Sequence, residues 1–124
     1  MLSTGVDIIE ISRIARTLER YGDRFLRRIY TPGELEYCRG RPSKLASRFA
    51  AKEATMKALG TGVRGVGWKD IEVTRAPSGA PGILLHGRAK ARAERLGVLE
   101  ISVSMSDSQD NAVAFVVTRR EDTG

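Results

Sequence analysis

The chain has 124 residues, a length that favours one domain over residues 1–124 with a single hydrophobic core. Apolar residues make up 41% and charged residues 29%, which is typical of a globular protein, and no apolar run is long enough to span a bilayer. The net charge of +6 indicates an anionic partner, and a lone Cys38 without a signal peptide favours a reduced, cytoplasmic setting.

The first half of the chain is predicted to form one strand and three helices. Residues 5–11 are rich in β-branched side chains and predict a strand, while apolar spacings of three and four predict a helix over residues 12–21. Thr31 and Glu34 have the spacing of a capping box, which predicts a short helix ending near residue 40. Ser43 is expected to cap a third helix that runs to residue 59.

The second half is predicted to consist mainly of strands. A glycine-rich connection at residues 60–67 comes first, and the expected strands are 68–75, 82–86, 99–105 and 112–118, with a helix at 88–96. Neighbouring strands separated by turns favour antiparallel pairing. The sequence therefore predicts an α+β fold in which a small antiparallel sheet packs with helices.

Glu53 lies beside the apolar stripe of the third predicted helix, where an unpaired carboxylate would be costly. Lys57 follows it by four residues and is placed to form an ion pair with it. An ordinary ion pair at the edge of the core is the simpler interpretation of this spacing.

Asp7 interrupts the apolar run of the first predicted strand. The simpler interpretation is an outward-facing residue on a half-exposed strand. If Asp7 and Glu53 converged, they would form a site for a hard cation, because Mg²⁺ binds few protein oxygens and completes its shell with water and phosphates. Spacing alone leaves that convergence open.

Six segments, taken in order, resemble the holo-acyl-carrier-protein synthase family of phosphopantetheinyl transferases. They read GVDIIEISRI, FLRRIYTPGELEYC, SRFAAKEATMKALGTG, DIEV, SGAP and VSMSDSQDNAVAFVV. The resemblance implies a transferase fold assembled as a homotrimer, with sites at the subunit interfaces. It also implies a Mg²⁺-dependent enzyme that moves phosphopantetheine from coenzyme A to a serine of apo acyl carrier protein, releases adenosine 3′,5′-bisphosphate, and supports fatty acid biosynthesis.

The resemblance further implies roles for single residues. Asp7 and Glu53 match the magnesium ligands, and Glu53 and Lys57 are the expected catalytic residues, with either Glu53 or a metal-bound water taking the serine proton. Residues that match coenzyme A contacts are Arg48, Lys57, Gly60, Thr61, Gly62, Pro81 and Asp107. Residues that match the docking surface for the carrier protein are Arg13, Arg24, Phe25 and Arg28.

Asp107 departs from the family, which often has histidine at this position, and Ala80 stands where a lysine is common. Asp107 is expected either to act through the magnesium shell or a bound water, or to cap its loop by accepting a hydrogen bond from the backbone of Gln109. His86 and Cys38 have no evident catalytic partner, so a structural role is expected for both.

Two other functions remain to be weighed. A carrier-binding subunit without catalysis would require a broken metal pair, whereas both carboxylates are present. A nucleic-acid-binding protein is favoured by charge alone, because aromatic residues make up only 6% and form no base-stacking stripe. We therefore expect neither nucleic acid nor a membrane as a partner.

Overall fold

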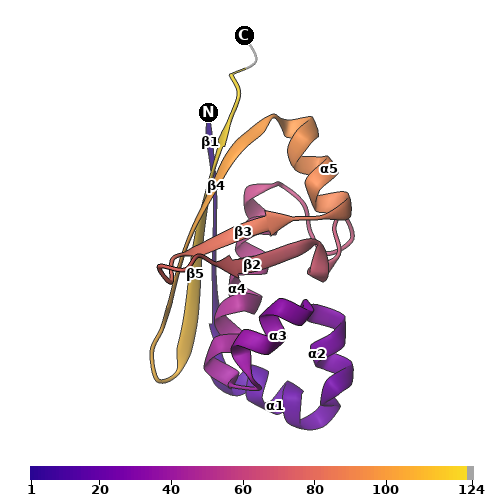
Figure 1. Cartoon of the computed structure of the whole chain (residues 1–124), viewed down its shortest axis with the longest axis vertical. Coiled ribbons are helices and arrows are strands. Elements are labelled where there is room, and N and C mark those ends of the chain that lie inside the picture. Colours follow the sequence, from indigo (N-terminus) through magenta and orange to yellow (C-terminus); the bar gives the residue numbers. More distant parts are fainter. Residues whose placement is uncertain (123–124) are drawn as a thin grey trace.

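The computed structural model describes residues 1–122 and confirms the α+β class. A long helix, α4, packs against a three-stranded sheet and contacts α1, α3 and β2 on its other sides (Figure 1). None of the helices in this described part is long and apolar enough to cross a membrane. The elements are β1 (Leu2–Glu10), α1 (Ile11–Tyr21), α2 (Asp23–Ile29), α3 (Pro32–Cys38), α4 (Pro42–Ala58), a 3₁₀ turn η1 (Trp68–Asp70), β2 (Ile71–Arg75), β3 (Pro81–Leu85), α5 (Gly87–Leu96), β4 (Val98–Asp107) and β5 (Asn111–Arg120).

The strands form two separate antiparallel sheets. The larger has the order β1-β5-β4, and the smaller is the β2-β3 hairpin. The expected antiparallel pairing is confirmed for β2 with β3 and for β4 with β5, whereas β3 and β4 belong to different sheets and β1 joins the larger sheet beside β5. The first strand in the chain thus lies next to the last.

The predicted helix boundaries are partly confirmed. Thr31 and Glu34 form the expected capping box at the start of α3: Thr31 Oγ1 accepts from the Glu34 N–H, and Glu34 Oε1 accepts from the Thr31 N–H. Ser43 is not the cap of α4, because Pro42 already occupies the first helical position, where its fixed φ suits the helix and its missing N–H costs nothing.

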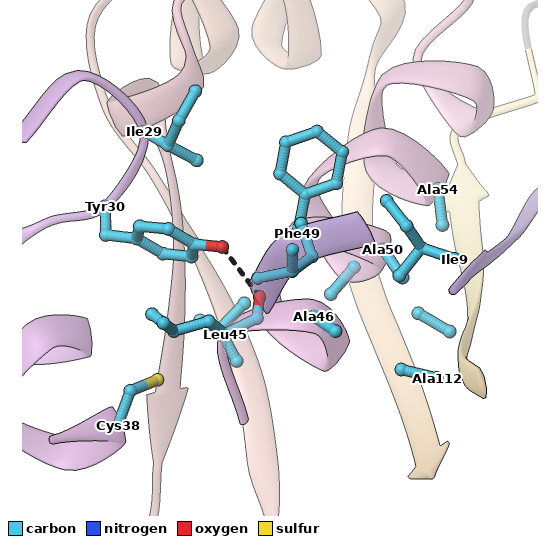
Figure 2. Packing of buried hydrophobic residues seen from close by; sticks show 14 of the residues in the cluster. Ile9, Ile29, Tyr30, Cys38, Leu45, Ala46, Phe49, Ala50, Ala54 and Ala112 are labelled. Atoms are coloured by element: carbon cyan, nitrogen blue, oxygen red, sulfur yellow. Dashed lines mark hydrogen bonds between the residues drawn. The ribbon is translucent and has the colours of Figure 1, made fainter. Parts of the chain in front are cut away.

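Helix α4 is buried on nearly every side. Toward the sheet it presents alanines, among them Ala50 and Ala54, which are fully buried together with Ala112 of β5 (Figure 2). On another side Leu45 accepts a 2.8 Å hydrogen bond from the Tyr30 hydroxyl at its backbone carbonyl. Small side chains between helix and sheet let the two backbones lie close together.

Gly5 of β1 marks the closest approach between the sheet and α4. A Cβ atom at this position would overlap the carbonyl oxygen of Ala54 and lie 3.0 Å from the backbone nitrogen of Ala58. Both are backbone atoms of a buried helix, so neither can move without shifting α4. Only glycine fits at this point of the strand.

We expect Gly5→Ala to lower the free energy of unfolding by about 1–3 kcal/mol, since the added methyl group overpacks the interface between strand and helix. Urea unfolding followed by circular dichroism measures the change. Gly62→Ala is the matched control, because a Cβ atom there meets nothing within 4 Å. Equal stability of the two variants would contradict the close packing.

Candidate active site

The contact between β1 and α4 brings Asp7 close to Lys57, which lies 50 residues later in the sequence. Asp7 lies two residues after Gly5 on the sheet face that packs against α4, and its side chain is only 16% exposed. Lys57 Nζ lies 3.2 Å from Asp7 Oδ1 and donates a 3.0 Å hydrogen bond to the Val6 carbonyl oxygen. The outward-facing interpretation of Asp7 is therefore wrong.

The ion pair predicted between Glu53 and Lys57 does not form. Lys57 turns instead toward β1, because the strand offers both a carboxylate and a carbonyl oxygen. Glu53 stays half-buried without an ion-pair partner among residues 1–122. This leaves its carboxylate free for another cation.

The electrostatic environment of Glu53 links it to Asp7. Burial raises the pKa of the Glu53 carboxyl, and the nearby Asp7 carboxylate raises it further, while Lys57 and Arg13 act in the opposite direction. The two carboxylates are therefore close enough to repel each other. They offer oxygen ligands suited to Mg²⁺, and within residues 1–122 no third acidic, His or Cys side chain joins them, as fits an ion that keeps several water molecules.

Glu53 and Lys57 line a groove of about 410 Å³ together with apolar and aromatic side chains. Among these, Phe49 and Trp68 stack with their ring centroids 4.8 Å apart and their planes at 25°. The full lining is Arg13, Phe49, Glu53, Met56, Lys57, Thr61, Gly62, Val63 and Trp68. Two of the predicted coenzyme A contacts, Thr61 and Gly62, thus share a groove with the predicted catalytic residues.

Arg48 lies outside this groove, in a second cavity of about 220 Å³. Its guanidinium stacks on the Tyr37 ring at 4.3 Å, and the guanidinium groups of Arg75 and Arg41 lie 4.5 and 5.4 Å from the same ring. Arg48 Nη2 is buried and has no hydrogen-bond partner in the structure. Because an unsatisfied buried donor is costly, this cluster is suited to an anion.

The other predicted coenzyme A contacts are dispersed. Pro81 begins β3 and pairs with Arg75, so it lies near the arginine cluster, whereas Gly60 follows the C-terminal end of α4 with a φ of 69°. Asp107 Oδ2 lies 3.6 Å from Lys44 Nζ. The interpretation that Asp107 caps its loop by accepting from backbone N–H groups such as that of Gln109 is wrong: within residues 1–122 no backbone N–H donates to it, and in this loop the Asn111 N–H donates to Ser108 Oγ instead.

The predicted docking residues divide into two groups. Arg24, Phe25 and Arg28 line one hollow of about 340 Å³ together with Thr17 and Tyr21. Arg13 lies apart from them, on the wall of the groove beside Glu53.

Cys38 and His86 have the structural surroundings that the sequence predicted. Cys38 is fully buried in the core. His86 Nε2 lies 3.0 Å from Glu72 Oε1, and this hydrogen bond lowers the pKa of the Glu72 carboxyl.

The electrostatic link between the two carboxylates is testable in metal-free protein. We expect Asp7→Asn to lower the pKa of Glu53, because the substitution removes a like charge, and Lys57→Ala to raise it, because the substitution removes an opposite charge. NMR titration of the Glu53 side-chain carboxyl measures both shifts. No change in Asp7→Asn would mean that the carboxylates do not interact.

Comparison with known proteins adds a consistent set of similarities. Residues 3–116 match the model of the 4′-phosphopantetheinyl transferase superfamily. The chain is 50% identical to the holo-[acyl-carrier-protein] synthase of Koribacter versatilis, over 94% of this chain and 97% of that one, and 53% identical to that of Gloeobacter violaceus, over 90% and 88%. Among solved structures, it resembles holo-[acyl-carrier-protein] synthase of Helicobacter pylori in complex with coenzyme A, with 33% identity and a TM-score of 0.86 over 94% of this chain and 99% of that one. It also resembles the synthase of Neisseria meningitidis, with 39% identity and a TM-score of 0.87 over 95% of this chain and 98% of that one.

Proposed function

The chain belongs to the holo-[acyl-carrier-protein] synthase family of the 4′-phosphopantetheinyl transferase superfamily, and we propose that it transfers phosphopantetheine from coenzyme A to a serine of apo acyl carrier protein. The observation that carries this proposal is that Asp7 lies beside Glu53 and Lys57, which both line the groove. Relatives that are themselves named for the reaction, one of them with coenzyme A bound, support the choice of both substrates. A role in fatty acid biosynthesis is part of the proposal.

The residues around the groove suit an attack on a pyrophosphate. The serine oxygen forms a bond to the β-phosphorus of coenzyme A, the bond from that phosphorus to the bridging oxygen breaks, and adenosine 3′,5′-bisphosphate leaves. Lys57 and Arg13 bring positive charge to the pyrophosphate, and Asp7 and Glu53 would hold Mg²⁺, which when bound supplies further charge neutralisation. The raised pKa of Glu53 supports it as the acceptor of the serine proton.

The experiment is mass spectrometry of apo acyl carrier protein incubated with this protein, coenzyme A and Mg²⁺. We expect one phosphopantetheine to be added, and we expect chelation of the metal to stop the reaction. Asp7→Ala and Glu53→Ala should each slow transfer at least about 100-fold while the fold remains intact by circular dichroism. Full activity of either variant would refute the assignment of the metal ligands.

We further propose that the enzyme is a homotrimer whose sites lie between subunits. The face of the larger sheet that turns away from α4 carries apolar side chains at neighbouring positions, with Val6 53%, Ile8 64% and Phe115 46% exposed. An apolar surface of this kind favours burial against another copy. The placement of Arg48 in a cavity separate from the groove supports the same arrangement, because a neighbouring subunit could bring its own Arg48 to the nucleotide.

A shared site predicts complementation between inactive variants. Glu53→Ala and Arg48→Ala should each be inactive alone, but mixed subunits should restore roughly a quarter of the sites after random exchange. Transfer activity after mixing, with light scattering to count subunits, measures this outcome. Continued inactivity of a mixture shown to exchange subunits would place both residues in one subunit's site.

We also propose that Arg24, Phe25 and Arg28 dock the carrier protein, because they combine exposed positive charge with an aromatic side chain in one hollow. Arg28→Glu should raise the KM for carrier protein several-fold and leave that for coenzyme A unchanged, with the difference shrinking at high salt. The same reversal at Arg13 should affect both substrates, since Arg13 lines the groove. An equal effect of Arg28→Glu on both substrates would argue against docking.

A further inference from the structure

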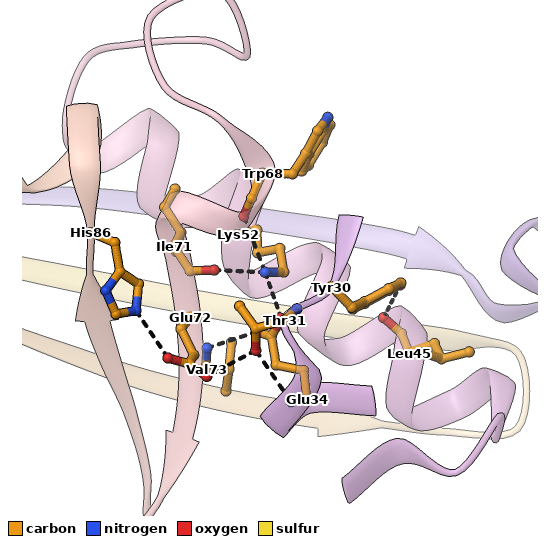
Figure 3. A network of polar contacts seen from close by, with 10 residues as sticks. All are labelled: Tyr30, Thr31, Glu34, Leu45, Lys52, Trp68, Ile71, Glu72, Val73 and His86. Atoms are coloured by element: carbon orange, nitrogen blue, oxygen red, sulfur yellow. Dashed lines mark hydrogen bonds and ion pairs between the residues drawn. The ribbon is translucent and has the colours of Figure 1, made fainter. Parts of the chain in front are cut away.

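A buried polar network extends from Glu34 through Lys52 to the backbone of Trp68, whose side chain lines the groove (Figure 3). At its centre is Lys52, which precedes Glu53 in α4 but points into the protein and is 0% exposed. Its Nζ atom lies 2.7 Å from Glu34 Oε1 and donates hydrogen bonds to the carbonyl oxygens of Ile71 at 2.6 Å and Trp68 at 3.1 Å. Three acceptors match the three N–H bonds of the ammonium group, so its hydrogen-bonding capacity is filled.

Glu34 is fixed in place by further hydrogen bonds. Its Oε1 accepts from the Thr31 N–H, and its Oε2 accepts from the Val73 N–H, both at 2.8 Å. The carboxylate therefore joins the start of α3 to strand β2. Because the partner of Lys52 is held from two sides, the lysine has one defined position between α4 and the segment that begins at Trp68.

That segment reaches the groove through Trp68. Residues 66–71 are held together by burial of Val66 and Ile71 and by a 3.0 Å hydrogen bond from the Gly67 N–H to Asp70 Oδ2. Lys52 ties this unit to α4 through two carbonyl oxygens, and the Trp68 ring then stacks on Phe49 in the lining of the groove. Glu53, the neighbour of Lys52 in the same helix, lines the same groove.

We propose that Lys52 is a positioning residue for the transfer reaction: by holding the Trp68 segment on α4 it sets the width of the groove in which coenzyme A meets Glu53 and Lys57. That coenzyme A is the molecule in the groove rests on the proposed function. That Lys52 holds the Trp68 segment on α4 does not. Lys52 itself does not line the groove, so it acts through Trp68 and Phe49.

The test uses Trp68 as its own reporter, because it is the only tryptophan in the chain. In Lys52→Met we expect Trp68 emission to shift to longer wavelength and acrylamide quenching to increase, in protein without substrate. We also expect kcat/KM for coenzyme A to fall about 10- to 100-fold, since small displacements of a reacting site have effects of this size. The KM for carrier protein should stay unchanged, because the proposed docking hollow lies elsewhere.

Two controls separate positioning from a general loss of stability. Lys69→Met removes an exposed lysine from the same 3₁₀ turn, and Val116→Ala destabilises the core from β5, so both should keep the native Trp68 emission and kcat/KM. If Lys52→Met does not fold, the double variant Lys52→Met/Glu34→Gln is used, because it removes both charges and leaves no lone buried carboxylate. We expect this double variant to show the same changes in Trp68 emission and in kcat/KM.

A folded variant with native Trp68 emission would overturn the proposal. So would a changed emission with native kcat/KM for coenzyme A. If the wild-type protein itself transfers nothing, the proposed function fails, but the fluorescence result still decides whether Lys52 holds Trp68.

Discussion

Direct contact between the backbones of β1 and α4 determines the geometry of the candidate site. Gly5 lies against the carbonyl of Ala54, so the strand can approach the helix without an intervening side chain. Two residues later the same face of β1 presents Asp7, which is thereby within reach of Lys57 and in the electrostatic range of Glu53. If β1 lay farther from α4, the ion pair between Asp7 and Lys57 would break and the repulsion between the Asp7 and Glu53 carboxylates would weaken. The chemistry of the groove therefore depends on a residue that has no side chain.

Helix α4 contacts the sheet, the core and the groove with different sets of side chains. Its alanines pack on the sheet, its larger apolar residues face the core and the groove, and Lys52 and Glu53 are consecutive residues with opposite environments. The buried ammonium group joins parts of the fold, while the half-buried carboxylate faces the groove. This division explains why a segment of small side chains contains two adjacent charged residues.

Local patterns in the sequence predicted local structure well. The capping box of Thr31 and Glu34 was predicted from their spacing, and the position of Glu53 beside the apolar stripe followed from helical spacing. The same reasoning gave Lys57 the wrong partner, because a helix pattern contains no information about a strand that starts fifty residues earlier in the chain. It also treated Glu34 only as a cap, since its contact with Lys52 arises when α3 and α4 pack together.

The arginine cluster around Tyr37 had no local signal at all. Its members come from α3, α4, β2 and the connection before α4, and they meet only in the folded chain. Arg48 was singled out by family resemblance, but Arg41, Arg75 and Tyr37 were not.

The opposite orientations of Lys52 and Glu53 limit how the length of this chain can vary. Each residue added to a helix turns everything beyond it by about 100°, so one insertion before Lys52 would turn the buried cation out of its site and the groove carboxylate away from Asp7. Compensation by a second change would have to restore both orientations at once. We therefore expect variation in length in connections such as residues 76–80, which lie outside the regular elements and the groove, whereas the spacing within α4 is fixed as strictly as its composition.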